Sequence, residues 1–159
     1  MKKINIIILI IWMILIFSFS QDSGGASSKK SDGIAHLMVN FISEVTGKDF
    51  NGSTLEDTLN ICIFIVRKSA HFLEYFILGF LIIRVLKDYK ILNNNICLYG
   101  IIFCFLYACS DEIHQLFVPN RSGRIIDVFI DTSGSILSIF LYYKYYLFKN
   151  KKCSSLKTT

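Results

Sequence analysis

The sequence predicts an all-α integral membrane protein, a four-helix bundle with a short amphipathic helix in an outer loop. Of its 159 residues, 53% are hydrophobic and 18% are charged, whereas about a quarter are charged in an ordinary soluble domain. The apolar residues lie in four long blocks, and a membrane-spanning helix needs about 20 of them. We therefore expect residues 1–159 to form a single membrane domain.

The four blocks predict spans at about residues 4–20, 68–87, 95–114 and 125–147. The first block follows two lysines and resembles a signal peptide, with a weak cleavage site near residue 20. Its apolar stretch is longer than the ~7–15 residues usual for a signal peptide, so we expect an uncleaved span.

A shorter helix is expected between the first two spans. Asp32 is a reasonable N-cap, and apolar residues then recur at helical spacing until Gly47. These apolar residues are Ile34, Leu37, Met38, Phe41, Ile42 and Val45. The stripe is too short to cross a bilayer, so we expect the helix to lie in the outer interface or to pack on the bundle.

The following helix is expected to begin at a capping box, Ser53-Thr54-Leu55-Glu56, which satisfies free backbone N–H groups. A helix from there to Lys87 would be about 50 Å long, so its first turns should project from the membrane or bend. Asn93–Asn95 predicts an inner turn and Pro119–Gly123 an outer turn.

Positive charges set the expected orientation. With four spans, three basic clusters fall on the same side: Lys2/Lys3, Arg84/Lys87/Lys90 and Lys149/Lys151/Lys152. The positive-inside rule makes this side cytoplasmic, so both termini are expected inside and the loops 20–66 and 111–124 outside. The net charge of +5 forms no basic face, and we expect no nucleic-acid partner.

Polar residues gather at the expected outer ends of the last three spans. Charged groups near a bilayer are costly unless they pair, meet water or take part in chemistry. In chain order they are Lys68, His71, Glu74, Asp111, Glu112, His114, Gln115, Arg121, Arg124, Asp127 and Asp131. Because span direction alternates, we expect one cluster on one membrane face. Gly134 extends the last stripe and should let another helix come close.

Catalysis and metal binding are two interpretations of this cluster. His71 or His114 could transfer protons, while Glu74, Asp111 and Asp127 orient the histidine, in an enzyme acting on a lipid-linked substrate. The same five residues offer ligands for a divalent cation. The sequence has no HExxH or paired CxxC, so we assign no metal ligand and no cofactor. The five cysteines lack metal or redox spacing and are expected to pack in the core.

Ligand binding and a structural network are the other two interpretations. Six residues are assigned to ligand binding: Lys68, Glu112, Gln115, Arg121, Arg124 and Asp131. Lysine and arginine side chains could hold a phosphate or carboxylate head group. Alternatively, pairs such as Lys68–Glu74 and Arg124–Asp127 could neutralise each other and fix helix register.

The polar residues resemble the VanZ-like family of bacterial membrane proteins, named for a member linked to teicoplanin (glycopeptide) resistance. The resemblance covers most of the chain and rests on Lys68-x-x-His71-Phe72-x-Glu74-Tyr75, Asp111-Glu112-x-His114-Gln115-x-Phe117-x-Pro119-x-Arg121 and Asp127-Val128-x-x-Asp131 with Gly134. It implies a bacterial cell membrane, contact with membrane lipids and a contribution to tolerance of lipid-bearing glycopeptides. It supplies no mechanism.

We therefore expect an outward-facing site that binds an anionic envelope lipid or precursor head group. A membrane-embedded enzyme and a structural network without a ligand are the alternatives. The sequence predicts neither the ligand, nor whether a reaction is catalysed, nor the oligomeric state.

Overall fold

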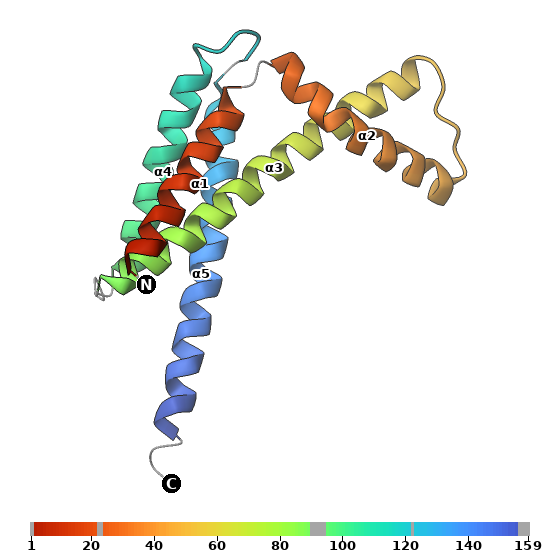
Figure 1. Ribbon diagram of the computed structural model, residues 1–159. Coiled ribbons are helices and arrows are strands. Elements are labelled where there is room, and N and C mark those ends of the chain that lie inside the picture. Colours follow the sequence, from red (N-terminus) through yellow and green to blue (C-terminus); the bar gives the residue numbers. More distant parts are fainter. Residues whose placement is uncertain (1, 22–23, 90–94, 122, 156–159) are drawn as a thin grey trace.

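The computed structural model describes residues 2–21, 24–89, 95–121 and 123–155, and all regular elements in these ranges are helices. The helices are α1 (Lys2–Ser20), α2 (Gly24–Thr46), α3 (Ser53–Asp88), α4 (Ile96–Gln115) and α5 (Ile125–Ser155). Helices α1, α3, α4 and α5 form a bundle, while α2 crosses the part of α3 that projects from it (Figure 1). The predicted all-α fold is confirmed.

Four helices are long and apolar enough to cross a membrane: α1, α3, α4 and the Ile125–Tyr146 part of α5. Large apolar side chains, such as Ile14, Leu106 and Phe140, are exposed on their outer surfaces. A soluble monomer rarely exposes such extensive apolar surface, whereas lipid would cover it. The chain is therefore a multi-pass membrane protein in a lipid environment.

Helix α3 begins at Ser53, where the sequence predicts it, and continues without a break through the predicted span at residues 68–87. Its 36 residues correspond to about 54 Å, and its first turns project from the bundle, as expected (Figure 1). The predicted capping box is wrong, because Gly52 is the N-cap and no side chain caps the helix. Gly52 has a positive φ of 58°, so the chain turns one residue earlier and Ser53 is already helical.

Helix α2 also begins earlier than predicted, at Gly24, so Asp32 lies within the helix and not at its N-cap. Small polar residues are tolerated in this first part, where the Ser31 hydroxyl donates to the Ser27 carbonyl at 3.2 Å. Gly47, with φ 64°, follows the helix as expected.

One side of α2 packs on α3 through Ala35 and Val39, which contact a cluster around Cys62. The other apolar residues of its stripe, including Leu37, Phe41 and Val45, are exposed. The helix thus packs on the projecting part of α3, and its place in the membrane interface stays a prediction.

The closest packing in the bundle lies between α3 and α5. A Cβ atom on Gly134 would overlap the Phe72 carbonyl oxygen, and one on Gly79 would overlap Ser135 and Ser138. The predicted role of Gly134 is therefore confirmed. Cys62 and Cys104 are buried, and Cys97 and Cys109 are partly buried and free, as expected for packing residues. The side chain of Cys153 and most of the predicted inner turn, Asn93–Asn95, lie outside the described residues.

Hydrogen bonds attach α1 to the bundle. Trp12 Nε1 donates to the Glu74 carbonyl at 3.0 Å, and the Tyr107 hydroxyl donates to the Met13 carbonyl at 2.7 Å. Near the beginning of α1, the Asn5 side-chain amide donates to the Asp88 carboxylate at 2.5 Å. Removal of α1 would leave these groups unpaired and uncover part of the core.

We expect Gly134→Leu to lower the free energy of unfolding by about 1–3 kcal/mol, because the larger side chain forces α3 and α5 apart. Gly33→Ala is the matched control, since a Cβ there meets nothing within 4 Å. That control should raise stability by up to about 1 kcal/mol. Denaturant titration of the purified protein in detergent measures both, and an unchanged Gly134→Leu protein would contradict the close approach.

Candidate functional site

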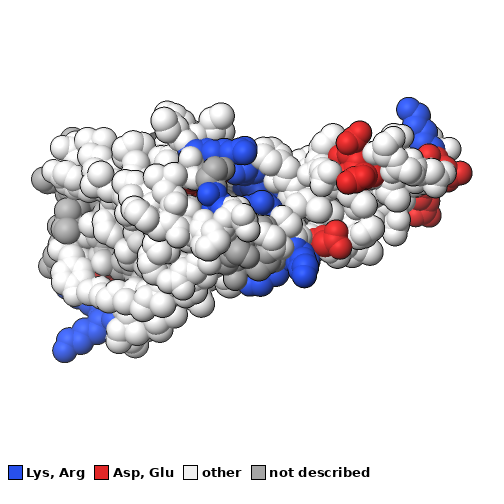
Figure 2. All heavy atoms as spheres, turned by 90° about the horizontal axis from the view of Figure 1, so that it is seen from above, with Lys and Arg blue, Asp and Glu red and all other residues white. Residues whose placement is uncertain are grey.

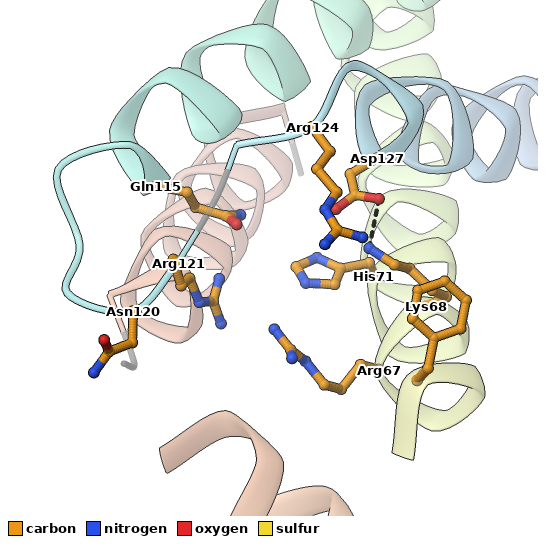
Figure 3. Close-up of a pocket in the computed structure, with 9 residues that line it drawn as sticks. Arg67, Lys68, His71, Gln115, Asn120, Arg121, Arg124 and Asp127 are labelled. Carbon is orange, nitrogen blue, oxygen red and sulfur yellow. Dashed lines mark ion pairs between the residues drawn. The ribbon is translucent and has the colours of Figure 1, made fainter. Parts of the chain in front are cut away.

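A cavity of about 220 Å³ opens between α3, the end of α4 and the loop that leads to α5 (Figure 3). Its lining residues are Phe64, Arg67, Lys68, His71, Gln115, Asn120, Arg121, Arg124 and Asp127. Four of them are cationic and one is acidic. Figure 2 shows basic side chains gathered around a hollow here, while acidic ones lie farther along the projecting α2–α3 arm. We call this space the cationic cavity.

The loop between α4 and α5 directs Arg121 into the cationic cavity. Backbone hydrogen bonds continue past the end of α4, and the Arg121 N–H donates to the Val118 carbonyl at 3.2 Å. Asn120 has a positive φ of 57°, a conformation that asparagine tolerates better than most residues. This turn points Arg121 back towards α3 (Figure 3).

Glu112 holds the beginning of α5. Its carboxylate accepts a hydrogen bond from the Arg124 backbone N–H at 2.8 Å, and the Asp127 N–H donates to the Arg124 carbonyl at 2.8 Å. A carboxylate here satisfies a free backbone donor and interacts favourably with the helix dipole. Glu112 is buried and does not line the cationic cavity, so its contact orients α5.

Lys68 and Asp127 form an ion pair between α3 and α5. Their charged atoms are 2.5 Å apart, and their side chains are 20% and 13% exposed. The predicted Lys68–Glu74 pair is wrong, because these residues are six positions apart on α3, about 9 Å along its axis. Instead, the Oε2 atom of Glu74 lies 3.7 Å from the Nδ1 atom of His71.

Five predicted site residues do not line the cationic cavity: Glu74, Asp111, Glu112, His114 and Asp131. Glu74 lines a neighbouring cavity of about 180 Å³, which shares Arg67, His71 and Arg121 with the cationic cavity. The His114 ring packs against Phe17, with ring centroids 4.3 Å apart, and lines neither cavity. Of the two candidate histidines, His71 is therefore the one that a ligand in either cavity would meet.

Two buried carboxylates lie behind His71. Asp111 and Asp131 are 2% and 0% exposed, and the Gln115 amide donates to Asp111 at 3.2 Å. His71, Asp111 and Asp131 each place one possible metal-ligand atom within 4.8 Å of the others. The structure thus brings together residues from α3, α4 and α5, as predicted.

Arg67 and Asn120 also line the cationic cavity, although neither was among the predicted site residues. Helical spacing could have identified Arg67, because it lies four residues before His71 and seven before Glu74. Asn120 offered no comparable signal, since its position depends on the path of the loop.

Four apolar helices with a polar cluster at one end define a multi-pass membrane protein. A sequence model of the VanZ/LLP1 family matches residues 5–149, so the chain belongs to this family. The matched region contains all the candidate residues from Lys68 to Asp131, and the predicted resemblance is confirmed. No curated protein and no solved structure matches the chain significantly.

We expect Lys68 and Asp127 to be energetically coupled by about 0.5–3 kcal/mol, because each partly buried charge compensates the other. A double-mutant cycle with Lys68→Met and Asp127→Asn, measured by denaturant titration in detergent, gives this coupling. The matched control is the His36–Asp32 pair on α2, whose side chains are 52% and 51% exposed. Its coupling should not exceed about 0.5 kcal/mol. Equal coupling in the two cycles would contradict the ion pair.

Proposed function

We propose that the protein binds the anionic head group of a cell-envelope lipid or lipid-linked precursor in the cationic cavity. The observation that carries this proposal is the shortage of hydrogen-bond partners around the Arg121 guanidinium group. Its buried Nε and Nη1 atoms have no hydrogen-bond partner among the described residues, and Nη2 donates only a 3.4 Å bond to the Phe19 carbonyl. A guanidinium group binds phosphate or carboxylate through such paired donors.

The other charges of the cationic cavity favour the same kind of ligand. Arg67 and Arg121 point towards each other across the cavity near His71 (Figure 3). Arg67 is repelled by Arg121 and Arg124, and it is attracted by Asp127. Because Asp127 already pairs with Lys68, a bound anion would relieve the remaining repulsion.

A neighbouring groove supports a lipid over a soluble anion. It has a volume of about 500 Å³ and shares Phe64 and Lys68 with the cationic cavity. Its other lining residues are Ile65, Ser69, Phe72, Leu73 and Ile130. A molecule with a charged head and an apolar tail could therefore place the head in the cavity and the tail in the groove.

We further propose that the cationic cavity faces the outside of a bacterial cell and that both termini are cytoplasmic. The start of α1, with Lys2 and Lys3, and the end of α3, with Arg84 and Lys87, lie away from the cavity, and Lys149 is near the end of α5, so the positive-inside rule favours this orientation. An outward site that holds an envelope lipid would reduce the access of a lipophilic glycopeptide, such as teicoplanin, to the membrane surface.

We expect purified protein to bind short-chain phosphatidic acid more tightly than short-chain phosphatidylcholine, as measured by calorimetric titration in detergent. Arg121→Gln should weaken phosphatidic acid binding about 10- to 100-fold, because a hydrogen bond to a charged group contributes about 1.5–3 kcal/mol. Lys149→Gln removes the same charge at the opposite end and should leave binding unchanged. If inorganic phosphate binds as tightly as phosphatidic acid, the lipid tail has no role.

The cellular arm of this experiment compares teicoplanin tolerance with and without the protein. Tolerance should fall in cells that carry His71→Ala or Arg121→Ala at the normal protein level. Unchanged tolerance in both variants, where the intact protein confers it, would refute the site assignment. A parallel loss of protein level or thermal stability would instead favour a structural network, and turnover of a lipid-linked substrate that His114→Ala abolishes would favour an enzyme.

The proposed orientation predicts which positions an impermeant thiol reagent can reach in intact cells. Single cysteines introduced as His36→Cys or Asn120→Cys, with the five native cysteines replaced, should react from outside. Lys149→Cys should react only after the cells are opened. The reverse pattern would overturn the orientation without affecting the fold.

A further inference from the structure

Three buried polar side chains beneath the cationic cavity have no part in the proposed head-group binding. They are Tyr75 on α3, Asp111 on α4 and Asp131 on α5, with exposed fractions of 0%, 2% and 0%. None of them lines the cationic cavity. His71 lies between the two regions, because it lines the cavity and also belongs to a cluster with Asp111 and Asp131.

Several polar atoms of this buried cluster have no hydrogen-bond partner, although the Gln115 amide donates to the other oxygen of Asp111. Both carboxylate oxygens of Asp131, the Oδ1 atom of Asp111 and the Tyr75 hydroxyl have no partner in the described part of the chain. An ionised carboxylate taken out of water costs several kcal/mol unless it is paired and hydrogen-bonded. Native structures leave few such groups unsatisfied, so Asp131 indicates a missing partner.

The surrounding charges do not supply that partner. Asp131 feels the negative charges of four other carboxylates, those of Asp111, Glu112, Asp127 and Glu74. Of the nearby cations, Lys68 pairs with Asp127, and Arg121 interacts with Asp111. The deepest carboxylate therefore lies in a region of negative potential, where a cation would bind favourably.

We propose that His71, Asp111 and Asp131 bind a divalent transition-metal ion. Their ligand atoms lie within 4.8 Å of one another, whereas atoms bound to a common tetrahedral Zn²⁺ ion at about 2.0–2.2 Å lie about 3.3–3.6 Å apart. Side-chain movements of up to about 1 Å, within the reach of rotamer adjustment, would complete the site. The ion would supply the positively charged partner that both oxygens of Asp131 lack.

The ligand set defines the kind of ion. One imidazole and two carboxylates suit Zn²⁺ or Mn²⁺, whereas Mg²⁺ and Ca²⁺ prefer oxygen ligands alone. Three protein ligands leave at least one coordination position for water or another ligand. His71 also lines the cationic cavity, so that position would be reached from the cavity. The proposal does not rest on head-group binding, because neither carboxylate lines the cavity.

The test uses full-length protein without a histidine tag, loaded with Zn²⁺ or Mn²⁺ and dialysed before elemental analysis. Wild-type protein should retain roughly one ion per chain. Asp131→Asn and Asp111→Asn keep the side-chain shape and should each weaken binding at least about 10-fold. Asp32→Asn and His36→Ala remove the same residue types from the exposed surface of α2 and should retain the ion.

A second measurement, the thermal unfolding of the same proteins with and without the ion, decides the question even if one variant folds poorly. Zn²⁺ or Mn²⁺ should raise the Tm of the wild type, and the shift should be lost in Asp131→Asn. Mg²⁺ should give a smaller shift. If the wild type retains no ion, or if both asparagine variants retain it as well as the wild type, the metal site is overturned. A different explanation would hold if Asp131→Asn has a higher Tm than the wild type and no ion shifts the wild-type Tm. In that case a proton, and not a metal ion, neutralises the buried carboxylates.

Discussion

The close approach of α3 and α5 is the constraint on which the rest of the structure depends. Gly79 and Gly134 let the two backbones meet, and any larger side chain at either position would overlap the facing helix. This short distance lets Asp127 reach Lys68 and brings Asp131 near His71. If the helices stood farther apart, Lys68 and Asp127 would lose their ion pair, and a partly buried charge without a partner is costly.

At the end of the bundle that contains the cationic cavity, the charged side chains are arranged in two layers. Arginine and lysine side chains surround the open cationic cavity, and Asp111 and Asp131 are buried beneath it. Each layer lowers the electrostatic energy of the other, because opposite charges attract across a short distance. His71 belongs to both layers and is therefore the residue through which a ligand in one would influence the other.

Sequence periodicity was sufficient to predict the apolar spans and the convergence of three polar groups, because both follow from helix length and alternating direction. It was not sufficient for contacts between helices. The partner of Lys68 depends on how α3 and α5 are rotated about their axes, which favours Asp127 over Glu74. A local sequence pattern also gave a wrong prediction where a neighbouring residue took the role that the pattern indicated. Gly52 begins α3 without help from the Ser53–Glu56 pattern.

The attachment of α1 has a consequence for biogenesis. Its hydrogen bonds join residues 62 and 94 positions apart, those of Trp12 to α3 and of Tyr107 to Met13. During synthesis α1 enters the membrane long before either partner exists, so insertion and docking are separate events in time. Until α3 is inserted, the first span must persist without these partners, and its bond with Tyr107 forms only after α4 follows. Residues 4–19 carry no charge, which suits the helix to a period alone in lipid, while Asn5 is paired only after α3 has been completed.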